Sequence, residues 1–323
     1  GMVPQLKDIA KVMKNSFGIK ISSKTLEIML KHSQRPHKFK DVIKRINMFS
    51  DIELFRLFGG IENVENQQIN LQKASRSQNA DIKKFIKDMK LFQEKVAQNP
   101  TSPGLETEFY FLHEQWKTGR IGMTSGAVNI QQNKLARHMV GMSAHSVEIP
   151  LEGNNHPFLI NFKRVVAEGL KIDIVQKDTV IIAELEKKLE EKEFADAIAI
   201  LKKQHKPNAE ALTTEEKIIL TVATKKGKMQ MQSFEALDSY AAYLVAKENP
   251  KKTSFTTELT TEVDGINNGV IIAALQLMLA GSTELANDVL TMLEKGGLFT
   301  HSKYDTYTDY KNEPGKNDVY QTL

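Results

Sequence analysis

The sequence predicts a mainly α-helical protein with a small β component. Apolar residues recur with a period near 3.6 over several long stretches, which favours amphipathic helices. Ser50 with Glu53 forms a capping box, and Thr213 with Glu216 forms another, so the starts of two helices can be placed directly. Residues 255–263 instead alternate strictly between apolar or β-branched side chains and polar ones, which is typical of a half-buried strand.

The expected elements follow one another along the chain. Residues 4–50 read as short amphipathic helices, and the polar segment 63–78 is expected to be a loop or a weak helix. Asn79 then caps a long helix that ends just before Pro100. Two apolar runs around a Glu-Gly-Asn-Asn turn predict a β-hairpin over 147–162. The remaining helices are expected at 164–170, 179–201, 215–224, 234–244, 270–280 and about 283–295.

The composition limits the class of protein. The chain has 41% hydrophobic and 26% charged residues, as ordinary globular proteins do. It has no cysteine, which excludes disulfides and thiolate metal sites and suits a reducing compartment. No apolar run approaches transmembrane length and no signal peptide precedes the first expected helix, so we expect a soluble, cytoplasmic protein without a membrane partner. The eight histidines show no metal-ligand spacing, and we assign His32 and His37 to a basic patch and His138 to a helix surface.

Positive charge is concentrated at the start of the chain. Residues 1–50 hold eleven Lys or Arg against three acidic residues, a net charge of +8, whereas the whole chain carries +4. A basic end on a near-neutral body is typical of a protein that contacts phosphates. A solvated, lysine-rich helical surface is the alternative. The candidate phosphate contacts are Arg35, Lys38, Lys40, Lys44 and Arg45.

A glycine-flanked arginine follows the only tryptophan. Arg120 lies between Gly119 and Gly122, so the backbone can approach a ligand closely while the guanidinium offers two parallel donors to a phosphate. The alternative is an irregular loop in which the arginine has no special role. An amide cluster and a short basic helix come next, and the candidate residues in them are Asn129, Gln131, Lys134 and Arg137.

The strand predicted at 255–263 ends in an acidic residue. Asp264 falls on the polar face of the strand, Gly265 permits a tight bend after it, and the apolar helix 270–280 should be buried. A carboxylate on a rigid strand end is a suitable ligand for Mg²⁺. The alternative is that Asp264 only opens an Asp-Gly turn.

These two motifs, in this order, resemble the single-subunit, phage-type DNA-directed RNA polymerases, especially their divergent schitovirus (Enquatrovirus-like) branch. The resemblance implies that Arg120 lies against the template strand and that the Asn129-x-Gln131 turn and the Lys134/Arg137 helix contact template or hybrid. It also implies that the Asp264 carboxylate and the Gly265 carbonyl bind catalytic Mg²⁺. Asp318-Val319-Tyr320 resembles the family's Asp-x-Tyr, in which the tyrosine lines the nucleotide site.

The resemblance also implies a division of the chain. Residues 1–100 would be a thumb-like basic region, 105–175 the Gly-Arg loop with a hairpin, 176–250 a helical region, and 251–323 the start of a palm. The family's His-Asp-Asp hairpin and its Lys/Tyr helix are not found after Asp264, although two-metal phosphoryl transfer needs a second carboxylate.

We therefore expect the N-terminal portion or one subunit of a polymerase, inactive alone, in the host cytoplasm. Its partners would be DNA template, RNA, nucleoside triphosphates and a second polypeptide. The alternative function is a non-catalytic, helical nucleic-acid-binding or structural phage protein. A metal-dependent phosphohydrolase would need a His/Asp cluster that the sequence lacks.

Overall fold

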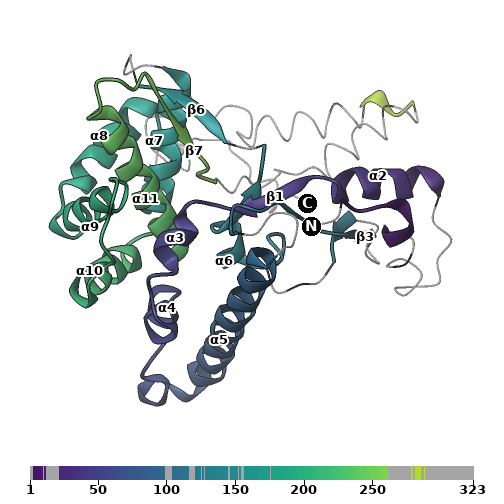
Figure 1. The fold of residues 1–323 in the computed structure, drawn as a ribbon, viewed down its shortest axis with the longest axis horizontal. Helices are drawn as coiled ribbons and strands as arrows, with labels where there is room; N and C mark the ends of the chain where they lie inside the picture. The colour runs from purple at the N-terminus through teal and green to yellow at the C-terminus, as the bar shows by residue number, and fades with distance from the viewer. Residues whose placement is uncertain are drawn as a thin grey trace.

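A computed structural model gives the fold of this chain, which is mainly α-helical with a small β component, as predicted (Figure 1). The N-terminal half contains α2 (Ser23–Ser33), β1 (Pro36–Phe39), α3 (Val42–Ile46), α4 (Asp51–Leu57), the 3-10 helix η1 (Val64–Asn66), α5 (Ile69–Ala97), β2 (Phe109–Tyr110), β3 (His113–Gln115), β4 (Ile121–Met123) and α6 (Lys134–Arg137). After these come β5 (Val140–Met142), β6 (Val147–Pro150), α7 (Pro157–Gly169), α8 (Asp178–Leu189), α9 (Lys192–Gln204), α10 (Thr214–Lys225), α11 (Gln230–Lys247) and β7 (Ser254–Thr257). The structure describes residues 3–9, 11, 22–98, 104–115, 121–124, 126, 128–144, 146–151, 153, 156–174, 176–260, 278, 281–284 and 287.

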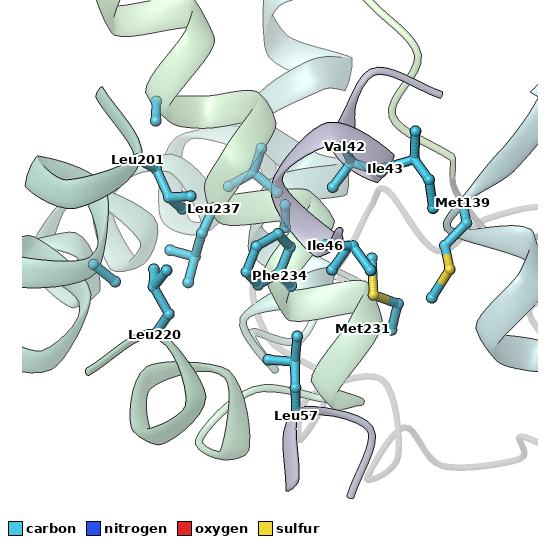
Figure 2. Packing of buried hydrophobic residues seen from close by; sticks show 14 of the residues in the cluster. Val42, Ile43, Ile46, Leu57, Met139, Leu201, Leu220, Met231, Phe234 and Leu237 are labelled. Atoms are coloured by element: carbon cyan, nitrogen blue, oxygen red, sulfur yellow. The ribbon is translucent and has the colours of Figure 1, made fainter. Parts of the chain in front are cut away.

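Helix α11 is the centre of the helical half of the molecule. It packs against α7, α9 and α10, which gather around it on the left of Figure 1. Residues 231–238 are buried without interruption, so this helix is enclosed on all sides rather than amphipathic. Figure 2 shows Met231 and Phe234 of α11 beside Ile46 of α3 and Leu57 of α4. The N-terminal segment therefore contributes directly to the core around α11.

In the described part of the chain the strands form three small antiparallel sheets. Strand β1 lies between β2 and β5, with His37 paired to Phe109 on one side and to Met142 on the other. Strands β3 and β4, which are close in sequence, form a second sheet, and β6 and β7 form a third in which Ile149 is opposite Phe255. A large hydrophobic cluster extends from Phe39 to Phe255 and includes residues of the first and third sheets, whereas Ile121 of β4 packs against a smaller second cluster. The four-part division of the chain stays a prediction.

The predicted hairpin at 147–162 is wrong. Strand β6 pairs with β7, about a hundred residues later, and Pro157 begins helix α7 with His156 as its N-cap. Proline at the first helical position needs no hydrogen-bond partner for its nitrogen, so the same residue suits a helix start as well as a strand edge. Local sequence cannot distinguish a nearby strand partner from a distant one.

Two helix boundaries also differ from the expectation. Helix α5 begins at Ile69 and Asn79 lies inside it, where its side chain bonds the backbone N–H and C=O of Ile61 at 2.8 and 2.7 Å. The single helix expected at 179–201 is two helices, α8 and α9, which meet at Glu190 and Glu191. Both capping boxes are confirmed. The alternation predicted from residue 255 is confirmed up to Thr257, because Phe255 and Thr257 are buried and Thr256 is exposed. Strand β7 ends at Thr257, earlier than predicted, and residues 258–260 are half-buried outside any strand.

Candidate site between the two sequence motifs

Helix α11 carries two buried carboxylates one turn apart, Glu235 and Asp238. A buried carboxylate is strongly destabilising unless charged or hydrogen-bonding partners compensate it. The Oε1 atom of Glu235 lies 2.6 Å from Nζ of Lys40, and its Oε2 accepts a hydrogen bond from Nδ1 of His138 at 2.7 Å. These three side chains are at most 4% exposed. The ion pair of Lys40 and Glu235 thus holds the residue after β1 against the core helix α11.

Asp238 compensates a second buried cation. Its Oδ2 accepts a hydrogen bond from Nη2 of Arg45 at 2.7 Å, and Nε2 of His205 lies 2.9 Å from its Oδ1. The same guanidinium donates to Asp41 at 2.8 Å. Burial alone would raise the pKa of Asp41, but hydrogen bonds from Lys44 and Arg45 lower it to about 2. Burial would lower the pKa of Arg45, yet the charge of Asp238 raises it overall.

The predicted phosphate contacts in the N-terminal segment therefore fall into two groups. Lys40 and Arg45 lie inside the protein in ion pairs, so the structure does not support direct phosphate contact by either of them. Lys38 is partly exposed and pairs with Glu258 at 2.7 Å, and Lys44 pairs with Asp41 and Glu106 at 2.8 and 2.9 Å. Arg35 is exposed.

The histidine assignments are partly wrong. His138 is 0% exposed rather than on a helix surface, and His37 is 2% exposed, so neither belongs to an open basic patch. His138 follows the short helix α6 and must face inward because its ring is bonded to Glu235.

The Asn129-x-Gln131 turn holds the strand that begins immediately after Arg120. Asn129 is buried, its Oδ1 accepts from the backbone N–H of Gln131 and Gln132, and its Nδ2 donates to the carbonyls of Met123 and Thr124. Gln131 Oε1 accepts from the backbone N–H of Met123 at 2.7 Å. These two amides tie β4 to the turn.

The two basic residues of the following helix differ in their surroundings. Arg137 donates from Nε to the carbonyl of Ile130 at 2.7 Å and from Nη2 to that of Gln131 at 3.0 Å, so its guanidinium stabilises the turn. Lys134 is exposed on α6. Asn133 caps this helix by accepting from two backbone N–H groups. Of these residues, Lys134 is the best placed to meet a phosphate.

A pocket of about 570 Å³ lies between the Asn129-x-Gln131 turn and the chain that leaves β7. Gln131 and Arg137 line it from the turn, and Leu259 and Thr260 line it from the chain that leaves β7. Lys40 and the strand β5 complete its wall. Thr260 is four residues before Asp264, and β4, which Gln131 holds, starts one residue after Arg120. Thr260, the described residue closest in the chain to Asp264, and Gln131, which holds β4, therefore line the same cavity.

The metal ligands expected from the sequence, Asp264 and Gly265, are outside the described residues, as are Gly119, Arg120 and Tyr320. Among the residues that the structure describes, no group of three or more His, Asp or Glu could hold a metal ion. Glu258, which lines the pocket, is paired with Lys38 at 2.7 Å. In the described part of the chain, no helix is both long and apolar enough to cross a lipid bilayer.

Comparison with known proteins identifies the relatives of this chain. A family model described as a virion DNA-directed RNA polymerase domain matches residues 24–140. The virion DNA-directed RNA polymerase of Enterobacteria phage N4 is 26% identical over 212 residues, which is 66% of this chain. The chain is related to the phage virion RNA polymerases. Its match spans only 6% of the N4 polymerase, so the activity of that whole protein is not transferred by the match alone.

The virion polymerase domain match covers the residues that build the pocket wall from the N-terminal side. Residues 24–140 include Lys40, Arg45, the Asn129-x-Gln131 turn and His138, and end before Asp264. No sequence pattern pointed directly to Glu235 and Asp238, because acidic residues three apart on a helix usually face solvent. Their position next to Phe234 and Leu237 was the available clue.

Proposed function

We propose that this chain forms part of the nucleic-acid-binding and metal-binding centre of a phage DNA-directed RNA polymerase. The pocket between the Gln131 turn and Thr260 supports the proposal, since Gln131 holds the strand that follows Arg120 and Thr260 is four residues before Asp264. The similarity to virion RNA polymerases supports the same function independently of the Asp264 motif, because the family match includes the Gly-Arg motif but ends at residue 140.

In this proposal, Asp264 and Gly265 supply two oxygen ligands to Mg²⁺, which usually takes one or two protein carboxylates and completes its shell with water and phosphate oxygens. The ion would stabilise the charge that develops as a nucleotide is transferred. Two-metal transfer requires a further carboxylate, which we assign to another part of the polymerase, in the same or a second polypeptide. Tyr320 would line the nucleotide site.

Nucleic acid would approach along exposed cations of two elements. Arg120 and Lys134 lie in and after the Gly-Arg motif, and Arg137 and the two turn amides act by holding that region in place. Helix α5 adds a stripe of exposed positions with spacings of three, seven and four residues, which share one helix face over about 21 Å. Its members are Lys73, Arg76, Lys83 and Lys87.

The decisive experiment localises the metal ion without requiring catalysis. The full chain is bound to single-stranded DNA, Fe²⁺ replaces Mg²⁺, and hydroxyl radicals generated by the ion cut the DNA close to it. We expect cutting at one region of the DNA, lost in Asp264→Asn and retained in Asp196→Asn, a matched change at an exposed aspartate of α9.

The alternative of a non-catalytic nucleic-acid-binding protein predicts a different result. Binding would then depend on salt through the basic surface, but cutting would be weak, spread along the DNA and equal in the two variants. That outcome would remove Asp264 from the metal site and with it the polymerase proposal.

A further inference from the structure

The chain segment that leads to Asp264 is tied to the N-terminal segment at three points. Nζ of Lys40 donates to Oγ1 of Thr260, 220 residues later in the chain. Lys38 pairs with Glu258 at 2.7 Å, and the other carboxylate oxygen of Glu258 accepts from the backbone N–H of Asp41 at 3.1 Å. The junction of β1 and α3 thus holds residues 258–260.

Lys40 is itself held in place from several directions. Its ammonium is fixed by Glu235 and its backbone N–H donates to the carbonyl of Met139 at 2.8 Å. Its side chain passes over Gly141 so closely that a Cβ there would lie 3.2 Å from Cε of Lys40. Because Lys40 is 3% exposed, water cannot easily replace Thr260 as a partner. The side chain of Lys40 is therefore held in one position, unlike a mobile lysine at the surface.

We propose that Lys40 and Thr260 are positioning residues that set the separation between the Gln131 turn and residues 258–260, which lead in the chain to Asp264. Lys40 lines the same pocket as Gln131 and Arg137, so the bond to Thr260 fastens one wall of that pocket to the other. The inference rests on the proposed function, but the quantity that it predicts is a distance between the two sides of the pocket. A lysine that sequence reasoning assigned to phosphate binding would thereby act through Thr260.

The test measures that distance directly. The chain has no cysteine, so Lys134→Cys and Glu262→Cys provide two unique sites for spin labels, and pulsed electron paramagnetic resonance gives the distribution of distances between them. Thr260 is the residue to change, because Thr260→Val removes the hydroxyl and keeps the β-branched shape. Lys40→Met would in addition leave Glu235 without its cation. Thr256→Val is the matched control, an exposed threonine of β7 four residues earlier in the chain.

We expect Thr260→Val to widen the distance distribution about twofold, because a segment released from an anchor samples several positions. Thr260→Ser should restore the narrow distribution and Thr256→Val should not change it, with the melting temperature the same in all of them. An unchanged distribution in Thr260→Val would overturn the inference, as would a widening that Thr256→Val reproduces.

The two proposals can fail separately. Asp264→Asn should leave the distance distribution unchanged while it abolishes iron-dependent cutting. A narrow distribution that depends on Thr260, combined with cutting that does not depend on Asp264, would reject the polymerase function and keep the positioning role. Cutting that depends on Asp264, combined with a distance distribution that Thr260→Val leaves unchanged, would keep the polymerase function and reject the positioning role.

Discussion

Gln131 accepts a hydrogen bond from the backbone N–H of Met123 at 2.7 Å, so an amide expected to face nucleic acid holds strand β4. Gln131→Leu should therefore loosen β4 rather than remove a phosphate contact. One net hydrogen bond contributes about 1 kcal/mol, so the Met123 amide should exchange with deuterium about fivefold faster. The exposed neighbour Gln132→Leu is the control, and equal exchange in both variants would contradict the role.

The Lys40–Glu235 pair should show strong coupling in a double-mutant cycle. Lys40→Met and Glu235→Gln each leave a buried charge without its partner, which typically costs about 3–5 kcal/mol. The double variant should be less destabilised than the sum of the singles by at least about 1 kcal/mol, measured by urea unfolding. The exposed pair of Lys44 and Glu106 should give a coupling free energy below about 1 kcal/mol. An equally small coupling free energy for Lys40 and Glu235 would contradict the prediction.

Stability should fall on mild acidification because of His113. Burial lowers the pKa of this imidazole from its usual 6.5 to about 4, against a hydrogen bond to the Phe111 carbonyl that raises it. Between these values the unfolded chain binds a proton that the folded one does not, so stability is lost as the pH falls. The expected loss is about 2 kcal/mol between pH 7 and pH 5.

His113→Asn tests this directly, because an asparagine amide can still donate to the Phe111 carbonyl but does not titrate. The slope of unfolding free energy against pH over this range should flatten in His113→Asn. It should persist in His156→Asn, where asparagine keeps the N-cap of α7. Parallel slopes in wild type and His113→Asn would exclude His113 as the cause.

Gly227 should tolerate no side chain. A Cβ at this position would lie 2.6 Å from Cβ of Ser233 and 2.7 Å from the carbonyl oxygen of Gly169, at the point where α10 turns into α11. Gly227→Ala should cost about 1–3 kcal/mol of unfolding free energy. Gly126→Ala, whose Cβ meets no heavy atom closer than 4.0 Å, should change it far less.

The exposed stripe on α5 should contribute to nucleic-acid affinity through phosphates. Each phosphate contact adds about one unit to the slope of log affinity against log salt, so Lys83→Ala with Lys87→Ala should lower that slope by about two. Lys187→Ala, an exposed lysine of α8, should leave it unchanged. Fluorescence titration of single-stranded DNA over a range of salt concentrations measures both slopes, and equal slopes would exclude this helix from the interface.

The features that depend on residues close together in the sequence were predicted correctly. The two capping boxes and the alternation at Phe255 and Thr257 were confirmed because each depends on residues a few positions apart. The partner of β6 could not be predicted, since any strand of matching alternation fits it equally well. The role of Lys40 was missed for the same reason: its acidic partner is 195 residues away, and a lysine in a basic segment reads as a surface cation.

The distance in sequence between Lys40 and Glu235 also governs the order of events during synthesis. The ribosome adds about 5–20 residues per second, so the basic segment emerges roughly 10–40 s before its acidic partner exists. During that interval Lys40 and Arg45 are open, unneutralised cations on a nascent chain. They become buried only when α11 is complete, so the nascent protein presents a more positive surface to cellular polyanions than the finished one does.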